Sequence, residues 1–299
     1  MMPGFPAYCM PCILDKHLRA MPDGWDEARR SAFLREAMRV IIEADPAEPA
    51  PIVTRRIDDL AQDWQVPLTD FRPIKRLWNG KMLTLAPELR ADIQAAPDPL
   101  ARAMQYARTA NYIDFGALTN VNEDELRGLL RRAPEDPLDP TEYDRFREDL
   151  AAAKHIAYLA DNCGEVVADL LLLEQLSALY PDSRITCVVR GEEVSNDATM
   201  EDARMVGLDR VVRVVSNGTG LTGTFIDEIA PVAREALDAA DVVISKGQAN
   251  FETLNGCGLN VYYLFLCKCE RFEKQFGIRR LQGVLANDRR LNEKREAIA

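Results

Sequence analysis

Polar side chains that suit a metal ion and a phosphate follow the apolar runs in the second half of the sequence. Asp161 and Asn162 come directly after one such run, and Asp197 lies a few residues after the next. Carboxylate and amide oxygens are the ligands that Mg²⁺ and Mn²⁺ prefer, and few soft ligands for zinc are present. Lys246 ends another run and precedes Gly247, so its ammonium and nearby backbone N–H groups are suited to a phosphate.

The runs that carry these residues predict a parallel β-sheet. They are apolar on both faces, as buried parallel strands are, and amphipathic helical segments separate them. In an open sheet of this kind, ligands bind beyond the carboxyl ends of the strands, so polar residues from different runs converge at one edge. The predicted strands are residues 155–160, 184–190, 210–216, 241–246 and 261–267, and the clearest helices between them are 165–180 and 225–240.

Each candidate residue also has a simpler interpretation when it is taken alone. An Asp-Asn pair after a strand is more often a turn or a helix cap than part of an active site. Lys246 by itself could be an ordinary exposed lysine at the end of a strand. The convergence of two carboxylates, several amides and a lysine on one sheet edge favours a metal and phosphate site.

The first part of the chain has a different pattern and is predicted to be helical. Four segments carry apolar residues at three- and four-residue spacing, and proline-rich connections separate them. These segments are residues 25–44, 54–64, 98–113 and 122–133. We therefore predict a helical region over 1–140, followed over 141–299 by a Rossmann-like α/β metal-binding domain. The predicted fold class is α/β, an αβα sandwich with a mostly parallel sheet.

The composition of the chain argues against nucleic acid and membranes as binding partners. The chain of 299 residues has 48 acidic and 37 basic side chains, a formal net charge of -11. Such a surface repels nucleic acid and anionic membranes. No apolar run approaches the roughly 20 residues of a membrane-spanning helix, and the first residues do not have the pattern of a signal peptide. We therefore expect a cytoplasmic protein that binds neither nucleic acid nor membranes.

The segments around the candidate residues resemble a known family, the metal-dependent damage-control phosphatases. This family is also called domain of unknown function 89 and was once described as protein carboxyl methyltransferases. The similar segments are DNCGEVVAD (161–169), RGEEVSNDATMEDARMVGL (190–208) and SKGQANFETL (245–254). Cys9-Met10-Pro11-Cys12, ANYIDFGAL (110–118) and Lys268-Cys269 are similar to the microbial branch of the family. The resemblance implies hydrolysis of phosphomonoesters of small metabolites, either sugar phosphates or damaged phosphometabolites.

The resemblance also implies roles for individual residues. The implied metal ligands, for Mn, Ni, Co or Mg, are Asp161, Asn162 and Asp197. The implied phosphate-binding residues are Lys246, with Gly247 and Asn250 in the same loop. We add Arg190, which is the last residue of the second predicted strand. We take Asp161 and Lys246 as the catalytic residues. Asp161 is favoured as a metal ligand over a covalent nucleophile, because the DxD arrangement of aspartyl-phosphate enzymes is absent.

The sequence also allows other functions, and it leaves the roles of several residues open. The main alternative is an S-adenosylmethionine-dependent carboxyl methyltransferase, which also binds its cofactor at such a strand edge. A nicotinamide or flavin enzyme is disfavoured, because GxGxxG does not follow the first predicted strand. Glu165 is a candidate general acid, and Asn111 and Asp114 either line the cleft or end a helix.

The cysteines allow two interpretations. Cys9 and Cys12 form a CxxC, and with Cys267 and Cys269 they could complete four thiolates around a metal. The alternative is that all four are reduced cysteines that pack within the fold.

Overall fold

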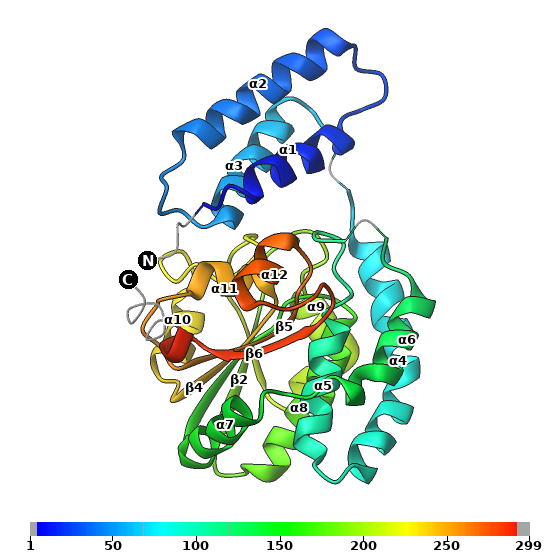
Figure 1. Cartoon of the computed structure of the whole chain (residues 1–299), viewed down its shortest axis with the longest axis vertical. Helices are drawn as coiled ribbons and strands as arrows, with labels where there is room; N and C mark the ends of the chain where they lie inside the picture. Colours follow the sequence, from blue (N-terminus) through cyan, green and yellow to red (C-terminus); the bar gives the residue numbers. More distant parts are fainter. Residues whose placement is uncertain (1–4, 68, 119, 292–299) are drawn as a thin grey trace. The chain divides into compact units, whose positions relative to one another are not determined.

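A computed structural model describes residues 5–67, 69–118 and 120–291 and divides the chain into two compact units, Met1–Asp70 and Phe71–Ala299 (Figure 1). The predicted boundary at residue 140 follows the change in sequence pattern, and the first strand begins somewhat later, at His155. The compact units divide earlier, because the helices after Asp70 pack on the helices and strands of the sheet domain.

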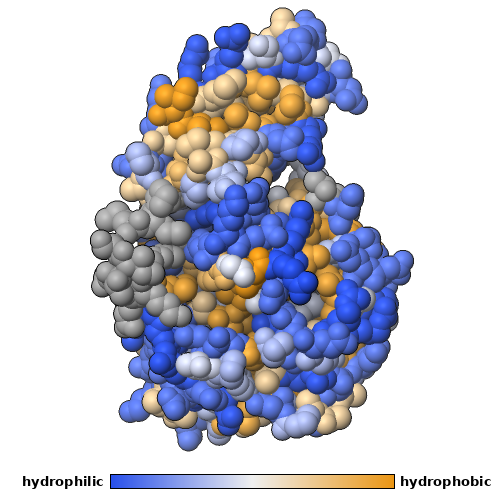
Figure 2. Space-filling model, in the orientation of Figure 1, coloured by the Kyte–Doolittle hydropathy of each residue, from blue (hydrophilic) through white to orange (hydrophobic). Residues whose placement is uncertain are grey.

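The first unit consists of three helices, α1 (Cys9–Ala20), α2 (Glu27–Glu43) and α3 (Ala50–Asp63). Its core contains Phe33, which is fully buried, and the rings of Trp25 and Trp64 pack against it with centroid distances of 6.0 and 5.7 Å. Figure 2 shows that apolar side chains also reach the surface of this unit. The helices are therefore held together by an aromatic core of their own.

A buried histidine links α1 to α3. His17 Nδ1 lies 2.7 Å from the carbonyl oxygen of Ile13, and His17 Nε2 lies 2.9 Å from Asp58 Oδ1. Burial raises the pKa of Asp58, but the hydrogen bond from His17 and the charges of His17 and Lys16 outweigh this effect. The net result is a pKa below the ordinary value of 3.8. The ionised Asp58 carboxylate therefore stabilises the packing of α1 on α3.

We expect Asp58→Asn to destabilise the first unit at neutral pH by about 1 kcal/mol or less, since the carboxylate is partly exposed. A carboxyl with a lowered folded-state pKa stabilises the fold above its unfolded pKa, and the contribution disappears as pH falls through the folded pKa. The difference between wild type and variant should therefore shrink below about pH 4. Denaturation in a Trp78→Phe background measures this, because the two remaining tryptophans both report the first unit.

The exposed Asp15, which pairs with Arg19 on α1, provides the matched control. Asp15→Asn should change the free energy of unfolding by only a few tenths of a kcal/mol. A stability difference between wild type and Asp58→Asn that stays constant from pH 7 to pH 2 would contradict the role of Asp58.

The second unit contains a six-stranded sheet in the order β3-β2-β1-β4-β5-β6. The first five strands pair in parallel, and β6 is antiparallel to β5. The strands are β1 (His155–Leu159), β2 (Arg184–Val189), β3 (Arg213–Ser216), β4 (Val242–Lys246), β5 (Val261–Leu266) and β6 (Gly283–Asn287). Each of the five predicted runs contains a strand, and β6 was not predicted.

Helices cover both faces of the sheet, so the predicted αβα sandwich is confirmed (Figure 1). Val242 and Ile244 of β4 face a layer that includes α4 (Arg72–Ala95), α5 (Pro99–Ala110) and α8 (Glu165–Leu179). On the other face, aromatic residues of α11 (Gln248–Leu254) and α12 (Glu270–Phe276) pack on Tyr263 and Phe265 of β5. The remaining elements are α6 (Glu123–Arg132), η1 (Ala133–Glu135), α7 (Pro140–Ala152), α9 (Met200–Val206), η2 (Leu208–Arg210) and α10 (Pro231–Asp238).

In the region predicted to be helical, residues 1–140, two described helices lie outside the four predicted segments. These are α1 and α4, and α4 carries Gly80 and Pro87 in its interior, where both residues disfavour a helix. Met82, Leu85 and Leu89 of α4 are buried in the core, so tertiary packing compensates for the unfavourable residues. Within the described residues, no helix is both long and apolar enough to cross a membrane.

Candidate active site

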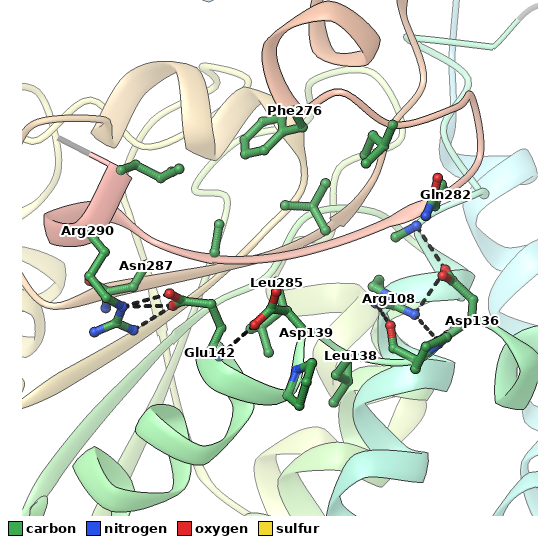
Figure 3. A pocket seen from close by; sticks show the side chains of 17 residues that line it. Arg108, Asp136, Leu138, Asp139, Glu142, Phe276, Gln282, Leu285, Asn287 and Arg290 are labelled. Atoms are coloured by element: carbon green, nitrogen blue, oxygen red, sulfur yellow. Dashed lines mark hydrogen bonds and ion pairs between the residues drawn. The ribbon is translucent and has the colours of Figure 1, made fainter. Parts of the chain in front are cut away.

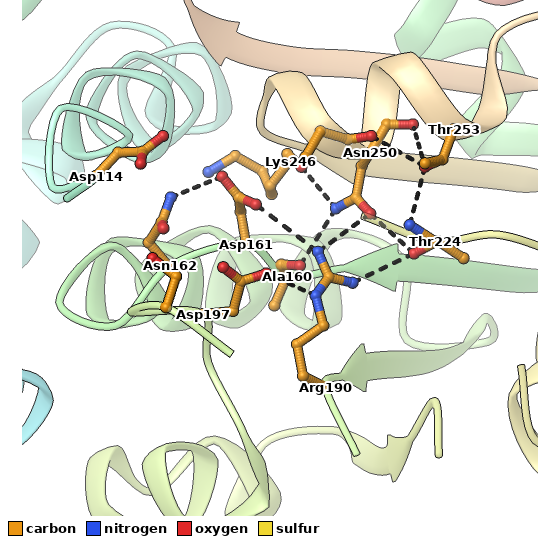
Figure 4. Close-up of polar contacts among 12 residues, drawn as sticks. Asp114, Ala160, Asp161, Asn162, Arg190, Asp197, Thr224, Lys246, Asn250 and Thr253 are labelled. Carbon is orange, nitrogen blue, oxygen red and sulfur yellow. Dashed lines mark hydrogen bonds and ion pairs between the residues drawn. The ribbon is translucent and has the colours of Figure 1, made fainter. Parts of the chain in front are cut away.

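The candidate site lies where the order of the strands changes direction. From β1 the chain moves first toward β2 and β3 and later returns to β4 on the opposite side of β1. Ligands bind at such a switch point, beyond the carboxyl ends of the two central strands. Asp161 follows β1 and Gly247 follows β4, so the loops of both central strands contribute to the site (Figure 4).

Backbone contacts bring the three predicted metal ligands together. Asn162 and Asp197 form an isolated antiparallel β-bridge. The N–H of Ala198 donates to the carbonyl oxygen of Asp161 over 2.8 Å. The loops after β1 and β2 are therefore joined, and they place the side chains of Asp161, Asn162 and Asp197 in one buried cluster.

Hydrogen bonds orient the side chains of this cluster. Asn162 Nδ2 donates to Asp161 Oδ2 over 2.6 Å, and Arg190 Nε donates to Asp197 Oδ2 over 2.7 Å. Arg190 Nη2 also lies 3.8 Å from Asp161 Oδ1. Within the described part of the chain, no hydrogen bond reaches Asn162 Oδ1 or Asp197 Oδ1. Two hard oxygen atoms therefore remain for a cation.

Gly247 brings the backbone after β4 against Asp161. Its φ is 81°, and a Cβ atom at this position would lie 2.0 Å from Asp161 Oδ2. Only glycine combines the left-handed backbone conformation with the absence of a Cβ. The predicted phosphate loop and the predicted metal ligand Asp161 are therefore in direct contact.

Lys246 is placed under the site, with its ammonium fully buried. Its Nζ lies 2.6 Å from Glu165 Oε1, 2.7 Å from Asp169 Oδ1 and 2.8 Å from the carbonyl oxygen of Ala107. Burial lowers the pKa of Lys246, but the two carboxylates outweigh this effect and raise it above its ordinary value. An ammonium has three N–H donors, so all three already have protein acceptors. A phosphate contact by Lys246 remains a prediction, and it would require one acceptor to be exchanged.

Arg190 and Asn250, the other predicted phosphate-binding residues, contact each other. Arg190 Nη2 donates to Asn250 Oδ1 over 3.3 Å, and Asn250 Nδ2 donates to the Lys246 carbonyl oxygen over 2.7 Å. Thr224 Oγ1 also donates to Asn250 Oδ1, over 2.8 Å. Arg190, Asn250 and the backbone of Lys246 therefore form one hydrogen-bonded group beside the predicted metal ligands (Figure 4).

Two residues from the helical layer complete the network. Asn111 directly follows α5, and its Nδ2 donates to Glu165 Oε2 over 2.8 Å and to Asp161 Oδ2 over 3.1 Å. Asn111 thus both ends a helix and lines the site. The Glu165 carboxylate, the candidate general acid, is fully buried and shared between Lys246 and the amides of Asn111 and Asn162.

Asp114 and Lys268 form a further ion pair that the sequence patterns left unassigned. Lys268 Nζ lies 2.7 Å from Asp114 Oδ2, and the lysine side chain is fully buried. Lys268 follows the end of β5 by two residues. The rule that selected Asp161, a polar residue just beyond a strand end, would therefore also have selected Lys268.

The charges of the site fit a divalent cation. Five carboxylates and three cations lie in the network, so two negative charges are uncompensated when all groups are ionised. The carboxylates are Asp114, Asp161, Glu165, Asp169 and Asp197, and the cations are Arg190, Lys246 and Lys268. Burial, followed by the charges of Glu165 and Asp197, raises the pKa of Asp161 well above its ordinary value. Burial also raises the pKa of Asp197 to about 6. A bound cation would relieve this repulsion.

The proposed metal ligands are two carboxylates, Asp161 and Asp197, and one amide, Asn162. They therefore do not form a cluster of three His, Cys, Asp or Glu side chains. Among the described residues, no group of three or more His, Cys, Asp or Glu side chains is arranged to hold a metal.

The two cysteine pairs, Cys9 with Cys12 and Cys267 with Cys269, belong to different compact units, so the four-thiolate interpretation stays a prediction. Cys267 is buried, whereas Cys12 and Cys269 are exposed.

A cavity of about 420 Å³ lies elsewhere in the second unit, between β6 and the start of α7 (Figure 3). None of the predicted site residues lines it. Four of its charged wall residues form ion pairs, Arg108 with Asp136 at 3.0 Å and Arg290 with Glu142 at 2.6 Å. The chemically active groups therefore cluster at the switch point of the sheet and not at this cavity.

Comparison with known proteins agrees with the fold and the family resemblance. A crystal structure of a DUF89 family protein from Pyrococcus horikoshii superimposes with a TM-score of 0.75 at 22% sequence identity, covering 95% of this chain and 99% of that one. A damage-control phosphatase from Archaeoglobus fulgidus is 29% identical over 279 residues, 90% of this chain and 94% of the relative. A damage-control phosphatase from Pyrococcus horikoshii is 30% identical over 179 residues, 59% of this chain and 61% of the relative.

The family model of the damage-control phosphatase ARMT1-like domain matches residues 5–281, which is most of the chain. This match includes all the residues of the candidate site. The chain therefore belongs to the damage-control phosphatase ARMT1-like family.

Proposed function

We propose that this protein is a metal-dependent phosphatase that hydrolyses phosphomonoesters of small metabolites. The observation that carries the proposal is the convergence of Asp161, Asn162 and Asp197 in a buried cluster with excess negative charge. The names of the archaeal relatives support the reaction class. Sugar phosphates and damaged phosphometabolites are the proposed substrates, because both present the same phosphoryl group to such a site.

The proposed metal ligands are Asp161, Asn162 and Asp197, and the proposed ions are Mn²⁺, Ni²⁺, Co²⁺ and Mg²⁺. A divalent ion at such a site polarises a phosphoryl oxygen and lowers the pKa of bound water. The protein's own groups prepare the ligands: the amide of Asn111 holds Asp161, and the guanidinium of Arg190 holds Asp197. Because these partners are buried, the ligand oxygens are held in place before substrate arrives.

Lys246, Gly247, Asn250 and Arg190 are the proposed phosphate-binding residues. Their positive charges and N–H groups lie beside the metal ligands, where negative charge develops on the phosphoryl oxygens during transfer. Hydrogen bonds orient Arg190 and Asn250 toward this position. Lys246 would exchange one of its three protein acceptors for a phosphoryl oxygen when the substrate binds.

We expect purified protein to release phosphate from phosphomonoesters only in the presence of a divalent metal. The test is a panel of phosphorylated metabolites assayed with Mn²⁺, Ni²⁺, Co²⁺ and Mg²⁺, each before and after removal of the metal by a chelator. A parallel assay measures methyl transfer from S-adenosylmethionine to protein carboxylates. Undiminished turnover after verified metal removal would reject the metal mechanism, and methyl transfer without phosphate release would establish the alternative function.

A further inference from the structure

Two buried polar side chains, Lys75 and Asn79, lie one turn apart on α4. Residues four apart share one face of a helix, and the other buried residues of α4 are apolar. Burial of a polar group is unfavourable unless the group is hydrogen-bonded, so both side chains need partners in the packed interior. α4 packs against α8 and α9, the helices that follow the two loops with the predicted metal ligands.

Asn79 binds the loop after β1. The N–H of Gly164 donates to Asn79 Oδ1 over 2.6 Å, and Gly164 lies two residues after the predicted ligand Asn162. The φ of Gly164 is 69°, and a Cβ atom there would lie 2.8 Å from Ile113 Cδ1 and 3.3 Å from Trp78 Cβ. Glycine therefore allows this loop to approach α4 closely.

The same asparagine binds the loop after β2 through Asp202. Asn79 Nδ2 donates to Asp202 Oδ1 over 2.8 Å, and Lys75 Nζ lies 2.7 Å from Asp202 Oδ2. The Asp202 carboxylate also accepts the backbone N–H and the hydroxyl of Thr199, each over 2.9 Å. Thr199 lies two residues after the predicted ligand Asp197, so this carboxylate connects α4 to the second ligand loop.

Lys75 holds the second loop on the other side of Asp197 as well. Its Nζ lies 2.8 Å from Glu193 Oε2, and Glu193 precedes Asp197 by four residues. Burial lowers the pKa of Lys75, but Asp202 and Glu193 outweigh this effect and raise it above its ordinary value. Within the described residues, the side chains of Lys75 and Asn79 form no hydrogen bond or ion pair with the predicted metal ligands.

These bonds oppose a repulsion inside the site. Asp161 and Asp197 are buried in one cluster and repel each other when both are ionised. The guanidinium of Arg190 lies against both carboxylates but supplies a single positive charge. Without a metal ion, the remaining repulsion favours separation of the two loops. Ligands that are held together before the metal arrives lose less freedom on binding, and this increases metal affinity.

We propose that Asn79, together with Lys75, positions the metal ligands by holding the loops after β1 and β2 at a fixed separation. The inference rests on the metal-dependent function proposed above and adds no ligand to that site. Asn79 is the central residue, because its amide accepts from the first loop and donates to the carboxylate that holds the second. A purely structural asparagine would stabilise the fold and leave metal affinity unchanged.

The test measures the Kd of Mn²⁺ by calorimetry, the absorption spectrum of bound Co²⁺, and amide hydrogen exchange of the metal-free protein. Asn79→Leu removes both hydrogen bonds at similar volume. We expect it to weaken Mn²⁺ binding by about 10- to 100-fold, the usual range for residues that orient metal ligands. It should also change the Co²⁺ spectrum and accelerate exchange of the Gly164 N–H. At saturating Mn²⁺, kcat should return toward the wild-type value, because the ligands themselves are unchanged.

An exchange of the two side chains tests the bond between Asn79 and Asp202. Asn79→Asp alone places two carboxylates together and should weaken Mn²⁺ binding as Asn79→Leu does. The double variant Asn79→Asp with Asp202→Asn restores the hydrogen bond with its direction reversed and keeps the total charge. It should recover part of the Mn²⁺ affinity, and a double variant that binds Mn²⁺ no better than Asn79→Asp would contradict the proposed link.

Asn287 provides a matched control, because it is also a buried asparagine of the second unit with one donated and one accepted hydrogen bond. Its Nδ2 donates to Asn260 Oδ1 over 2.8 Å, and its Oδ1 accepts the N–H of Arg289 over 3.0 Å. Asn287→Leu should lower thermal stability and leave Mn²⁺ affinity and the Co²⁺ spectrum unchanged. Asn79→Ala serves if Asn79→Leu does not fold. Should neither variant fold, Asn79 is a structural residue and the inference is overturned.

The outcomes separate this inference from the proposed function. If wild type is an active phosphatase and folded Asn79→Leu keeps wild-type Mn²⁺ affinity and Co²⁺ spectrum, the function stands and the positioning role is rejected. If wild type binds Mn²⁺ but hydrolyses no substrate, and Asn79→Leu binds Mn²⁺ more weakly, the function fails and the positioning role stands. A wild type that binds none of the proposed ions rejects the metal site and this inference with it.

Discussion

Asp161→Asn should abolish phosphate release and the stabilisation by metal, and it should make the metal-free protein more stable than wild type. Asp161 is a predicted metal ligand, so its loss should lower kcat/KM by at least about 10², given the several kcal/mol that a metal contributes to phosphoryl transfer. Without metal, the carboxylate is buried beside Glu165 and Asp197, and its raised pKa shows that its ionised form is disfavoured there. Asparagine removes that charge and still accepts hydrogen bonds.

Thermal unfolding with and without Mn²⁺, combined with metal analysis and kinetics, measures these three effects. A ligand at about 100 times its Kd stabilises the folded state by about 2.7 kcal/mol, and this increment should be absent in the variant. The same pattern is expected for Asp197→Asn, although its ion pair with Arg190 offsets part of the gain in the metal-free state.

Asp241 provides the matched control at the opposite edge of the same sheet. Its carboxylate accepts backbone N–H groups of His155 and Lys154, which lower its pKa. Asp241→Asn should therefore lower stability while metal binding and turnover stay normal. If Asp161→Asn instead keeps full metal content and near-normal kcat/KM, Asp161 is not a ligand.

Lys246→Met should destabilise the second unit by about 3 to 5 kcal/mol, the usual cost of removing one partner of a buried ion pair. The variant leaves Glu165 and Asp169 buried without their cation. Turnover should also fall by about 10² to 10³, either by loss of a phosphate contact or because Glu165 no longer holds the amide of Asn162. Chemical denaturation and kcat/KM measure the two effects separately.

A double variant separates the two roles of Lys246. Lys246→Met with Asp169→Asn removes one uncompensated charge and should recover part of the lost stability. Turnover should stay low in the double variant if Lys246 contacts phosphate, and it should recover in parallel with stability if the lysine only compensates the carboxylates. A Lys246→Met protein as stable as wild type would contradict the ion-pair network.

The strand pattern and the clustering of the candidate site residues could be predicted because both depend on local sequence. Buried parallel strands need apolar side chains on both faces, and polar residues are tolerated only beyond their ends. The run before Asp161 and the run that ends in Lys246 each show this change from apolar to polar. The carboxyl ends of parallel strands lie at one edge of the sheet. The proximity of Asp161 and Asp197 could therefore be predicted from the sequence alone.

Other features depend on contacts between distant residues. β6 is short, begins with glycine and is stabilised by pairing with β5, so its sequence alone does not distinguish it from a loop. α4 retains Gly80 and Pro87 because its apolar residues Met82, Leu85 and Leu89 are buried in the core that it shares with α8. The boundary between compact units falls at residue 70 for the same reason, since packing and not the helical pattern assigns α4 to the sheet domain.

The sequence by itself determined which residue types stand at the carboxyl edge of the sheet, since strand periodicity is a local property. Only the tertiary structure decided the partners of each charge. Lys246 shares the face of Val242 and Ile244 and therefore points into the helical layer, where Glu165 and Asp169 use its donors. Lys268 donates to Asp114, 154 residues away, and to no other acceptor within the described residues. The pKa of a buried charged group depends on its neighbours in space, and those neighbours come from segments that folding brings together.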